Sequence, residues 1–531
     1  MTNKKKLQIW LPLLLSIMMI AGMYLGYNLK GNIKQSNNFF NKDKRSSLQE
    51  ILDLINLKYV DSVKIDSIQE VTIQNIISTL DPHSVYIPST SIQEMNDNIS
   101  GNFGGVGIEF NMFKDTVHVL NVVPDGPSDK AGIQVTDRII SVDDKDVTGK
   151  NFSSEKIKKI IRGEIGSKLT LGILRNSTLL KIPIQRNVID IPAIDAAYML
   201  DKKTGYIHLS KFSLHSYREF MQNMEKLQKE GLENLVFDLR GNGGGLMNEA
   251  VNMLDEFLSD DKLLVYTKGL NTAKREYRAI RDGLLEKGKL IILVDELSAS
   301  ASEVVAGAIQ DWDRGTIIGR RTFGKGLVQE QYALSNGSAI RLTVARYYTP
   351  IGRSIQRAYD KGKKVYMDDM FDRYQHGDLY FSDSNKVSNG KEYKTKAGRI
   401  VYGNGGIMPD IFVAYDSSSF SNTTAKLLLS GVFNNFTYDY YHNNKKIFDQ
   451  FKSTADLLNN FKEMNRVWDS LVVAAIKDSI SLKSISDNIR KELELRILAN
   501  FARIKWRSLG FQQVMNSKDK MIEKALEEIK K

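Results

Sequence analysis

The spacing of hydrophobic residues changes several times along the 531-residue chain, and each change marks a different kind of segment. A largely apolar run extends from residue 7 to about residue 29. A run of about 20 apolar residues is long enough to cross a bilayer. Over 46–80, and again over 89–100, apolar residues recur every three or four positions, which is the period of a helix. The pattern predicts a transmembrane anchor or signal over 1–29, then a tether and helical N-terminal region over 30–100.

Residues 101–187 have short apolar runs separated by glycine-containing turns, which predicts a compact β-rich module. The expected strands are 117–123, 138–142 and 169–175, and the expected short helices are 126–133 and 153–161. The second residue of the first helix is Pro127, which suits an initial helical turn.

Strand and helix patterns alternate over 188–414, which predicts βα units around a central sheet. The expected strands are 204–212, 234–240 and 289–296, and the expected helices are 216–229, 247–258 and 300–312. A polar insertion at 357–400, rich in tyrosine and lysine, interrupts this pattern. From 415 to 531 the spacing is helical and glycine is almost absent, which predicts a separate α-helical domain.

Composition excludes several classes of function. The net charge is +11, but lysine and arginine are scattered among acidic residues, so we expect a solvated basic surface and no nucleic-acid partner. The chain has no cysteine, which excludes disulfides and thiolate catalysis. Its six histidines form no metal-binding pair, and we expect no metal and no cofactor.

The start of the chain favours an uncleaved anchor over a cleaved signal, because Ile20–Met23 is a poor cleavage site and Tyr24 and Tyr27 are typical of a membrane interface. Lys4, Lys5 and Lys6 precede the apolar run, although further basic residues follow it. We expect a bacterial inner-membrane protein with its bulk on the periplasmic side, or a secreted periplasmic protein if the signal is cleaved.

Ser300 lies where a strand pattern ends and a helix pattern begins. Backbone N–H groups at such a position are free and the helix dipole favours negative charge, so a serine there can attack a carbonyl while the Ala301 N–H binds the oxyanion. The pattern has a second interpretation, because Ser300 and Glu303 also form the S-x-x-E capping box.

Lys325 lies between two glycines, where the backbone can approach another element closely. A lysine acts as a base only if burial lowers its pKa from about 10.4 towards about 7–8. Gln329 follows four residues later, about 13 Å away in an extended strand, so it can contact the lysine only if the chain turns at Gly326. Gly319, Gly324 and Lys325 also match a phosphate-binding loop, but glycine replaces the required Ser or Thr.

A glycine-rich turn, Arg240–Gly245, follows a predicted buried strand. The free N–H groups of Gly243, Gly244 and Gly245 can complete an oxyanion site. An ordinary strand-to-helix turn is the alternative interpretation.

Taken together these segments resemble the C-terminal processing peptidases, also called tail-specific proteases, in family order over 46–413. The motifs that carry the resemblance are GGVGIEF, DGPSDKAGI, GYIHLSKF, VFDLRGNGGG, SASASEVVAGAIQD, GRRTFGKGLVQ, TPIGRSIQ and GGIMPDI. The resemblance implies a multidomain α+β protein with an α/β, crotonase-like protease core at 188–414. It also implies a catalytic group of Ser300, Lys325 and Gln329, with Ser300 preferred over Ser298 and Ser302.

The same resemblance implies a PDZ domain at 101–187 that binds protein substrates with free, apolar C-terminal tails. Its peptide-binding residues would be Gly105, Val106, Gly107 and Ile108. The chain departs from the family pattern at Val135–Asp137, where proline-glycine-aspartate is common, and at Asp295–Ser300, where glycines commonly precede the serines.

The leading hypothesis is therefore a membrane-anchored serine endopeptidase with a Ser/Lys dyad. A catalytically inactive PDZ scaffold and an adaptor-dependent protease are the alternatives. A trypsin-like PDZ protease would need a histidine base and a G-x-S-G segment, which no serine here has. A homo-oligomer or an adaptor protein is a further partner that the sequence leaves open.

Overall fold

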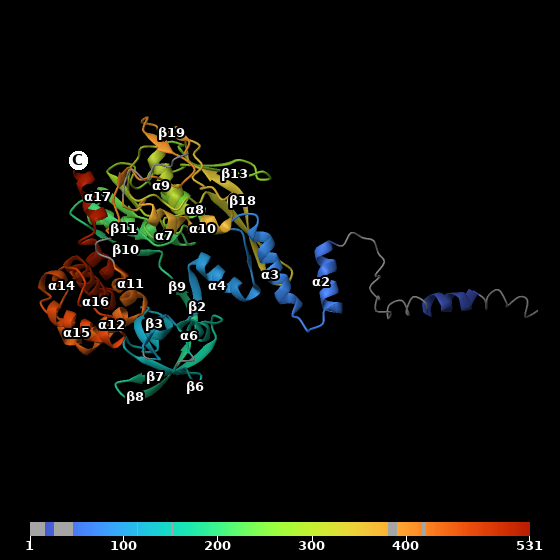
Figure 1. Cartoon of the computed structure of the whole chain (residues 1–531), viewed down its shortest axis with the longest axis horizontal. Coiled ribbons are helices and arrows are strands. Elements are labelled where there is room, and N and C mark those ends of the chain that lie inside the picture. Colours follow the sequence, from blue (N-terminus) through green and yellow to red (C-terminus); the bar gives the residue numbers. More distant parts are fainter. Residues whose placement is uncertain (1–15, 26–45, 114, 150–151, 381–389, 417–420) are drawn as a thin grey trace, which may run out of the picture. The chain divides into compact units, whose positions relative to one another are not determined.

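The computed structural model describes residues 16–25, 46–113, 115–149, 152–380, 390–416 and 421–531 (Figure 1). The chain divides into two units, Met1–Ile73 and Gln74–Lys531, and the candidate active site lies entirely in the second. The helical pattern expected over 46–80 forms two helices rather than one, α2 (Ser47–Lys58) and α3 (Ile65–Ser78). Ser46 starts α2 by accepting a hydrogen bond from the Gln49 N–H.

The predicted membrane anchor falls mostly outside the described residues, of which only 16–25 belong to it and are helical. In the described parts of the chain, no helix is long and apolar enough to span a bilayer. The anchor stays a prediction from the sequence.

The β-rich module is a six-stranded antiparallel sheet with two short helices, α5 (Pro127–Lys130) and α6 (Ser154–Ile161) (Figure 1). Its strands are β3 (Ile108–Phe113), β4 (Thr116–Val122), β5 (Arg138–Val142), β6 (Lys145–Asp146), β7 (Lys168–Arg175) and β8 (Thr178–Gln185). All five elements predicted here from the sequence are confirmed within a few residues. Alternate residues of β4, Val117 and Val119, are fully buried, as the two-residue period of a strand requires.

Two short elements precede this sheet, β1 (Val85–Ile87) and α4 (Ser89–Ser100). β2 (Asn102–Gly105), directly before the sheet in the chain, pairs with β9 (Asn187–Asp190), directly after it.

Residues 188–414 are built on a second six-stranded sheet, in the order β10-β11-β12-β15-β16-β21. Its strands are β10 (Ile194–Met199), β11 (Thr204–Leu209), β12 (Asn234–Asp238), β15 (Leu290–Val294), β16 (Thr316–Gly319) and β21 (Ile411–Phe412). All neighbours pair in parallel except β10 and β11. The carboxyl ends of the adjacent strands β12 and β15 therefore lie side by side, and so do the loops that follow them.

Helices cover both faces of this sheet. One face packs on α7 (Ser216–Lys229), α8 (Met247–Leu254) and α9 (Ala301–Asp311). In α7 the apolar residues Phe220, Met224 and Leu227 follow helical spacing and are fully buried. The opposite face packs on α17 (Lys520–Lys530) through Met521, Ile522 and Ala525.

A further sheet, antiparallel and with five strands, was not expected. The sequence indicated only βα units over 188–414. The further sheet consists of β1 with β13 (Leu263–Lys268), β14 (Arg275–Arg278), β17 (Leu327–Ala333) and β18 (Ala339–Tyr348). The local sequence signal for this sheet is weak, because β17 is largely exposed and its residues are typical of a polar loop. In this sheet β18 lies between β1 and β17, and the side chain of Gln329, at a bulge in β17, reaches the His83 carbonyl in the turn that precedes β1.

The 357–400 insertion contains α10 (Lys363–Gln375), β19 (Glu392–Lys394) and the start of β20 (Ile400–Tyr402). α10 is not a remote appendage, because the buried Arg373 donates hydrogen bonds to the carbonyls of Thr322 and Phe323, directly before Lys325.

The C-terminal helices from α11 to α16 share a hydrophobic core that includes Phe433, Leu471 and Phe501. They are α11 (Asn422–Leu429), α12 (Val432–Asn443), α13 (Lys445–Asp449), α14 (Thr454–Asn460), α15 (Met464–Lys477) and α16 (Asp487–Asn516). We call these six helices the helical bundle. The sequence indicated one separate helical domain up to 531, whereas α17 leaves the bundle and packs on the six-stranded sheet that contains β12 and β15.

Candidate active site

Ser300 occupies a strained turn between β15 and α9. Its φ of 55° and ψ of −111° are uncommon for a residue with a side chain. The two neighbouring serines are fully buried and structural, since the Ser298 hydroxyl donates to the Leu239 carbonyl and the Ser302 hydroxyl to the Asn242 carbonyl. Ser300 is the half-buried serine of the three.

The glycine-rich turn after β12 lies directly against Ser300. A Cβ added to Gly244 would be 2.8 Å from Ser300 Cβ and 2.9 Å from the Ala301 nitrogen. Asn242, which sequence reasoning missed, joins the two turns: its carbonyl accepts hydrogen bonds from the Ala299 N–H and the Ser302 hydroxyl. Its side chain also donates to the Leu209 carbonyl.

The structure separates the candidate oxyanion donors. The Gly244 N–H donates to the Asn242 Oδ1 at 2.8 Å, so it is occupied. Gly245, with a φ of 148°, packs its backbone against Phe212. Among the described residues, the N–H groups of Gly243, Gly245 and Ala301 have no hydrogen-bond partner. These three amides are the candidate donors around Ser300.

Lys325 and Gln329 meet despite the extended distance that the sequence suggested. The lysine Nζ donates to Gln329 Oε1 at 3.1 Å, because Lys325 precedes the first residue of β17 and a register shift follows Val328. The other end of the Gln329 amide donates to the His83 carbonyl at 2.7 Å. The turn before β1 therefore fixes the orientation of the glutamine, a contribution for which the sequence offered no signal beyond two prolines and a histidine.

Burial lowers the pKa of Lys325, and the nearby Arg341 lowers it further, while Glu303 and Asp81 act in the opposite direction. Burial also lowers the pKa of His83 to about 4, with a contribution from the charge of Lys325. A neutral imidazole beside the lysine adds no positive charge at neutral pH. The site therefore favours a lysine whose amine loses its proton more readily than in water.

Glu303 connects the serine turn to the lysine loop. One carboxylate oxygen accepts the N–H groups of Ser300 at 2.9 Å and Lys325 at 2.8 Å. The other accepts the Thr322 hydroxyl at 2.5 Å and the Gly324 N–H at 2.7 Å. The side chain is fully buried, and burial raises its pKa to about 7 against these four donors. The capping-box glutamate of the sequence is thus also the anchor of a second segment.

Tyr347, on β18, ties the same two segments from the other side. Its buried hydroxyl lies 3.0 Å from the Ser300 carbonyl and also contacts the Lys325 carbonyl. Burial raises the pKa of this phenol well above its usual value, so it stays a donor. The Ser300 hydroxyl and the Lys325 amine are not themselves hydrogen-bonded to each other among the described contacts.

The candidate tail-binding residues lie where the PDZ-like module is hollowed. Val106, Gly107 and Ile108 line a cavity of about 340 Å³ with residues of β3 and α6, whereas Gly105 is buried within β2. Within the described parts of the chain β3 pairs with β4 alone, so its other edge is open to an added strand.

Comparison with known proteins assigns these features. Residues 203–362 match peptidase family S41, 104–185 match the PDZ domain, and 423–507 match a family of unknown function. The chain is 34% identical over 351 residues to the carboxy-terminal-processing protease of Bartonella bacilliformis, covering 64% of this chain and 80% of that protein. The chain belongs to the carboxy-terminal-processing peptidases of family S41.

A second relative agrees with this assignment. This S41 peptidase is 30% identical to the carboxy-terminal processing protease CtpB of Bacillus subtilis, over 64% of this chain and 72% of that one. A solved structure described as the photosystem II D1 C-terminal processing protease is 26% identical, covering 71% of this chain and 88% of that chain, with a TM-score of 0.35. The protein is a serine protease with a PDZ domain.

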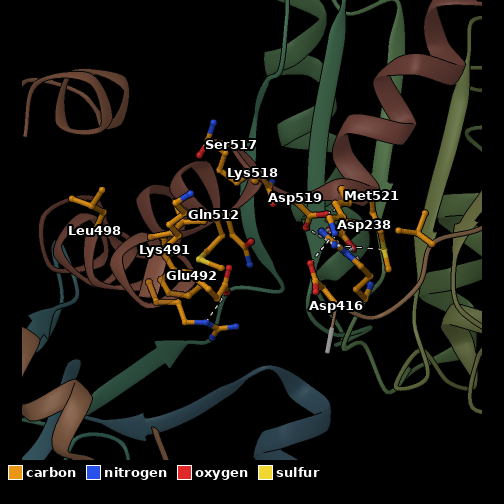
Figure 2. Close-up of a pocket in the computed structure, with 18 of the residues that line it drawn as sticks. Asp238, Asp416, Lys491, Glu492, Leu498, Gln512, Ser517, Lys518, Asp519 and Met521 are labelled. Atoms are coloured by element: carbon orange, nitrogen blue, oxygen red, sulfur yellow. Dashed lines mark hydrogen bonds and ion pairs between the residues drawn. The ribbon is translucent and has the colours of Figure 1, made fainter. Parts of the chain in front are cut away.

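Residues behind the glycine turn of this S41 peptidase form a charged cluster that sequence reasoning missed. Arg240 donates to the fully buried Asp238 and, at 2.6 Å, to Asp519 at the start of α17. The Tyr206 hydroxyl donates to the same Asp238 carboxylate at 2.8 Å. The cluster lies at the wall of a cavity of about 1140 Å³ that is also lined by α16 (Figure 2). Helix α17 therefore contacts, through Asp519, the residue that begins the glycine-rich turn.

No group of three or more histidine, aspartate or glutamate side chains in the described parts of the peptidase is arranged to hold a metal ion.

Proposed function

We propose that this peptidase captures the free C-terminal tail of a protein substrate in its PDZ groove and cleaves the adjoining chain with Ser300 and Lys325. The observation that carries the proposal is the double link between these residues. Glu303 and Tyr347 each contact the backbone of both, so two segments 25 residues apart are held as one unit. The lowered pKa of Lys325 supports its role as the base.

The first chemical step is acylation. Neutral Lys325 takes the proton from the Ser300 hydroxyl as its oxygen attacks the scissile carbonyl. The N–H groups of Ala301 and Gly243 stabilise the oxyanion, because they belong to the two adjoining turns and have no other partner among the described residues. The protonated lysine then donates its proton to the leaving amine, and the C–N bond breaks.

The second step is deacylation. Lys325 takes a proton from water, the resulting hydroxide attacks the acyl-serine, and the proton returns to the Ser300 oxygen as the product acid leaves. Gln329 orients the lysine amine in both steps by accepting one of its hydrogens. In the described structure the lysine donates to Gln329 and not to Ser300, and catalytic hydrogen bonds often tighten only when the substrate is bound.

Tail capture is tested by changing only the terminus of the substrate. We would compare cleavage of an unfolded protein that ends in a free carboxylate with the same protein carrying a C-terminal amide. Preferential cleavage of the free-carboxylate form supports capture through the PDZ loop. Equal rates would contradict tail recognition without excluding the dyad.

We further propose that residues 1–29 anchor the protein in the bacterial inner membrane with the catalytic part on the periplasmic side. The support is the apolar run after Lys4–Lys6 in the sequence. Alkaline carbonate extraction of membranes should leave the full chain in the pellet and release a chain that lacks 1–29. Release of both chains would contradict the anchor.

A further inference from the structure

The tail groove of the PDZ domain has a wall that does not belong to the PDZ domain. Arg503, an exposed residue of α16 in the helical bundle, lines the 340 Å³ cavity together with Ile108, Glu109 and Phe110 of β3. The bundle is held there by other contacts. The Arg507 guanidinium donates to the Val122 carbonyl on β4.

A second contact holds the bundle against the same hairpin. The ring of Phe113 stacks on Tyr438 of α12 with centroids 4.7 Å apart. The helices of the family of unknown function, matched over 423–507, therefore contact the strand to which a tail would add.

The register of an added strand decides which tail residue meets this wall. A tail whose carboxylate is held at 106–108 runs antiparallel to β3, so its last residue pairs with Ile108 and its penultimate residue with Glu109. Directly opposed residues place their side chains on the same face. Ile108 and Phe110 face the PDZ core, and Glu109 is exposed on the other face. The penultimate side chain therefore faces away from the core, towards the bundle.

Charge indicates what that side chain should be. Of the two charged groups that flank it, Glu109 keeps its negative charge, but its carboxylate accepts a hydrogen bond at 3.1 Å from the Asn121 amide on β4, on the side of β3 away from the open edge. Arg503 makes no hydrogen bond or ion pair with any described residue. The other cations of the groove are engaged: Lys158 pairs with Glu155, and Arg162 lies over the Phe103 ring at 4.1 Å.

We propose that the helical bundle takes part in substrate recognition, with Arg503 selecting tails that carry an acidic residue at the penultimate position. The inference rests on the proposed capture of tails in the PDZ groove. It assigns the bundle a specificity function that is separate from the chemistry at Ser300.

The test measures tail binding by the full chain carrying Ser300→Ala, so that no peptide is cleaved. Fluorescent peptides would share one apolar sequence and differ only in a penultimate Glu, Gln or Lys, with binding followed by anisotropy. We expect the Glu peptide to bind roughly fivefold more tightly than the Lys peptide, because one exposed charge pair is exchanged for a repulsion. Added salt should reduce this ratio.

Substitutions at Arg503 then locate the cause of the preference. Arg503→Glu should reverse the Glu-to-Lys ratio, and Arg503→Lys should keep it. Arg466→Glu, at an exposed arginine of α15 outside the groove, is the matched control and should behave as the parent. Thermal unfolding of each variant checks that the bundle is intact.

An unchanged ratio in Arg503→Glu, or equal affinity of the parent for all three peptides, would overturn the inference while leaving tail capture standing. An additional peptide with an amidated C-terminus separates the two proposals. If it binds as tightly as its free-carboxylate counterpart, tail capture fails, and the inference that depends on it fails as well.

Discussion

Gly244 should be irreplaceable because its Cα faces the turn that carries Ser300. It has a φ of +96°, and a Cβ built on it would lie 2.7 Å from the Ala299 oxygen and 2.8 Å from Ser300 Cβ. Ordinary Cβ contacts begin at 3.4 Å, so the two turns must separate by at least about 0.6 Å in Gly244→Ala. The left-handed backbone costs alanine about 1–2 kcal/mol, and displacing close-packed neighbours costs about 1–3 kcal/mol. We expect a loss of about 2–5 kcal/mol in the free energy of unfolding.

Gly243→Ala is the matched control for stability, because nothing lies within 4 Å of a Cβ at Gly243 and its φ is not positive. The assay combines thermal unfolding with the rate of tail-substrate cleavage. For a core of this size, Gly244→Ala should lower the Tm by about 4–20 °C. A displacement approaching 1 Å at reacting groups can cost about a hundredfold in rate. A Gly244→Ala protein with the Tm of Gly243→Ala and the cleavage rate of the parent would refute the packing argument.

Three further predictions concern charges around the site. Glu303→Gln should lower both the Tm and the cleavage rate. An amide nitrogen would replace a carboxylate oxygen that accepts two buried donors, and each donor left unpaired costs about 1–3 kcal/mol. A Tm equal to that of the parent would argue against the link that Glu303 makes between the serine turn and the lysine loop. The kcat/KM of the parent should rise with pH to a midpoint below 10.5, because we propose the neutral Lys325 amine as the base and burial lowers its pKa; a midpoint at or above 10.5 would contradict that role. Asp519→Asn keeps a good helix cap but removes the charge paired with Arg240. We expect a loss of about 1–2 kcal/mol in the free energy of unfolding, measured by chemical unfolding, and slower peptide hydrolysis. Unchanged unfolding and hydrolysis would show that α17 does not support the glycine-rich turn.

The sequence predicted those parts of the fold whose signals are local. The strands and helices around β12 and β15 were visible because fully apolar runs alternate with amphipathic ones, as in Leu290–Val294 and Ser216–Lys229. The antiparallel sheet around β17 was missed because its exposed strand has no regular alternation. The placement of α17 was missed because its apolar face fits a helix partner as well as a sheet.

The candidate site shows the same division. Ser300, Lys325 and the glycine turn stand in short segments with recognisable chemistry. The residues that position them act across long separations: His83 holds Gln329 from 246 positions away, and Tyr347 contacts Ser300 from 47 positions away. The sequence predicted Glu303 only as a helix cap for Ser300, although three of its four hydrogen-bond donors lie on the lysine loop. Such contacts depend on topology, which residue spacing does not encode.

The central claim is that Ser300 and Lys325 carry the cleavage together. We would incubate four proteins, the parent chain, Ser300→Ala, Lys325→Ala and the control Lys363→Ala, with an unfolded protein that ends in a free apolar tail. Lys363 is an exposed lysine of α10. Mass spectrometry would follow the products. The account predicts cleavage by the parent and the control, and none by the other two variants. Cleavage by Lys325→Ala at the parent rate would contradict the dyad, and no cleavage by a parent that still binds the tail would instead indicate an inactive scaffold or a protease that requires an adaptor.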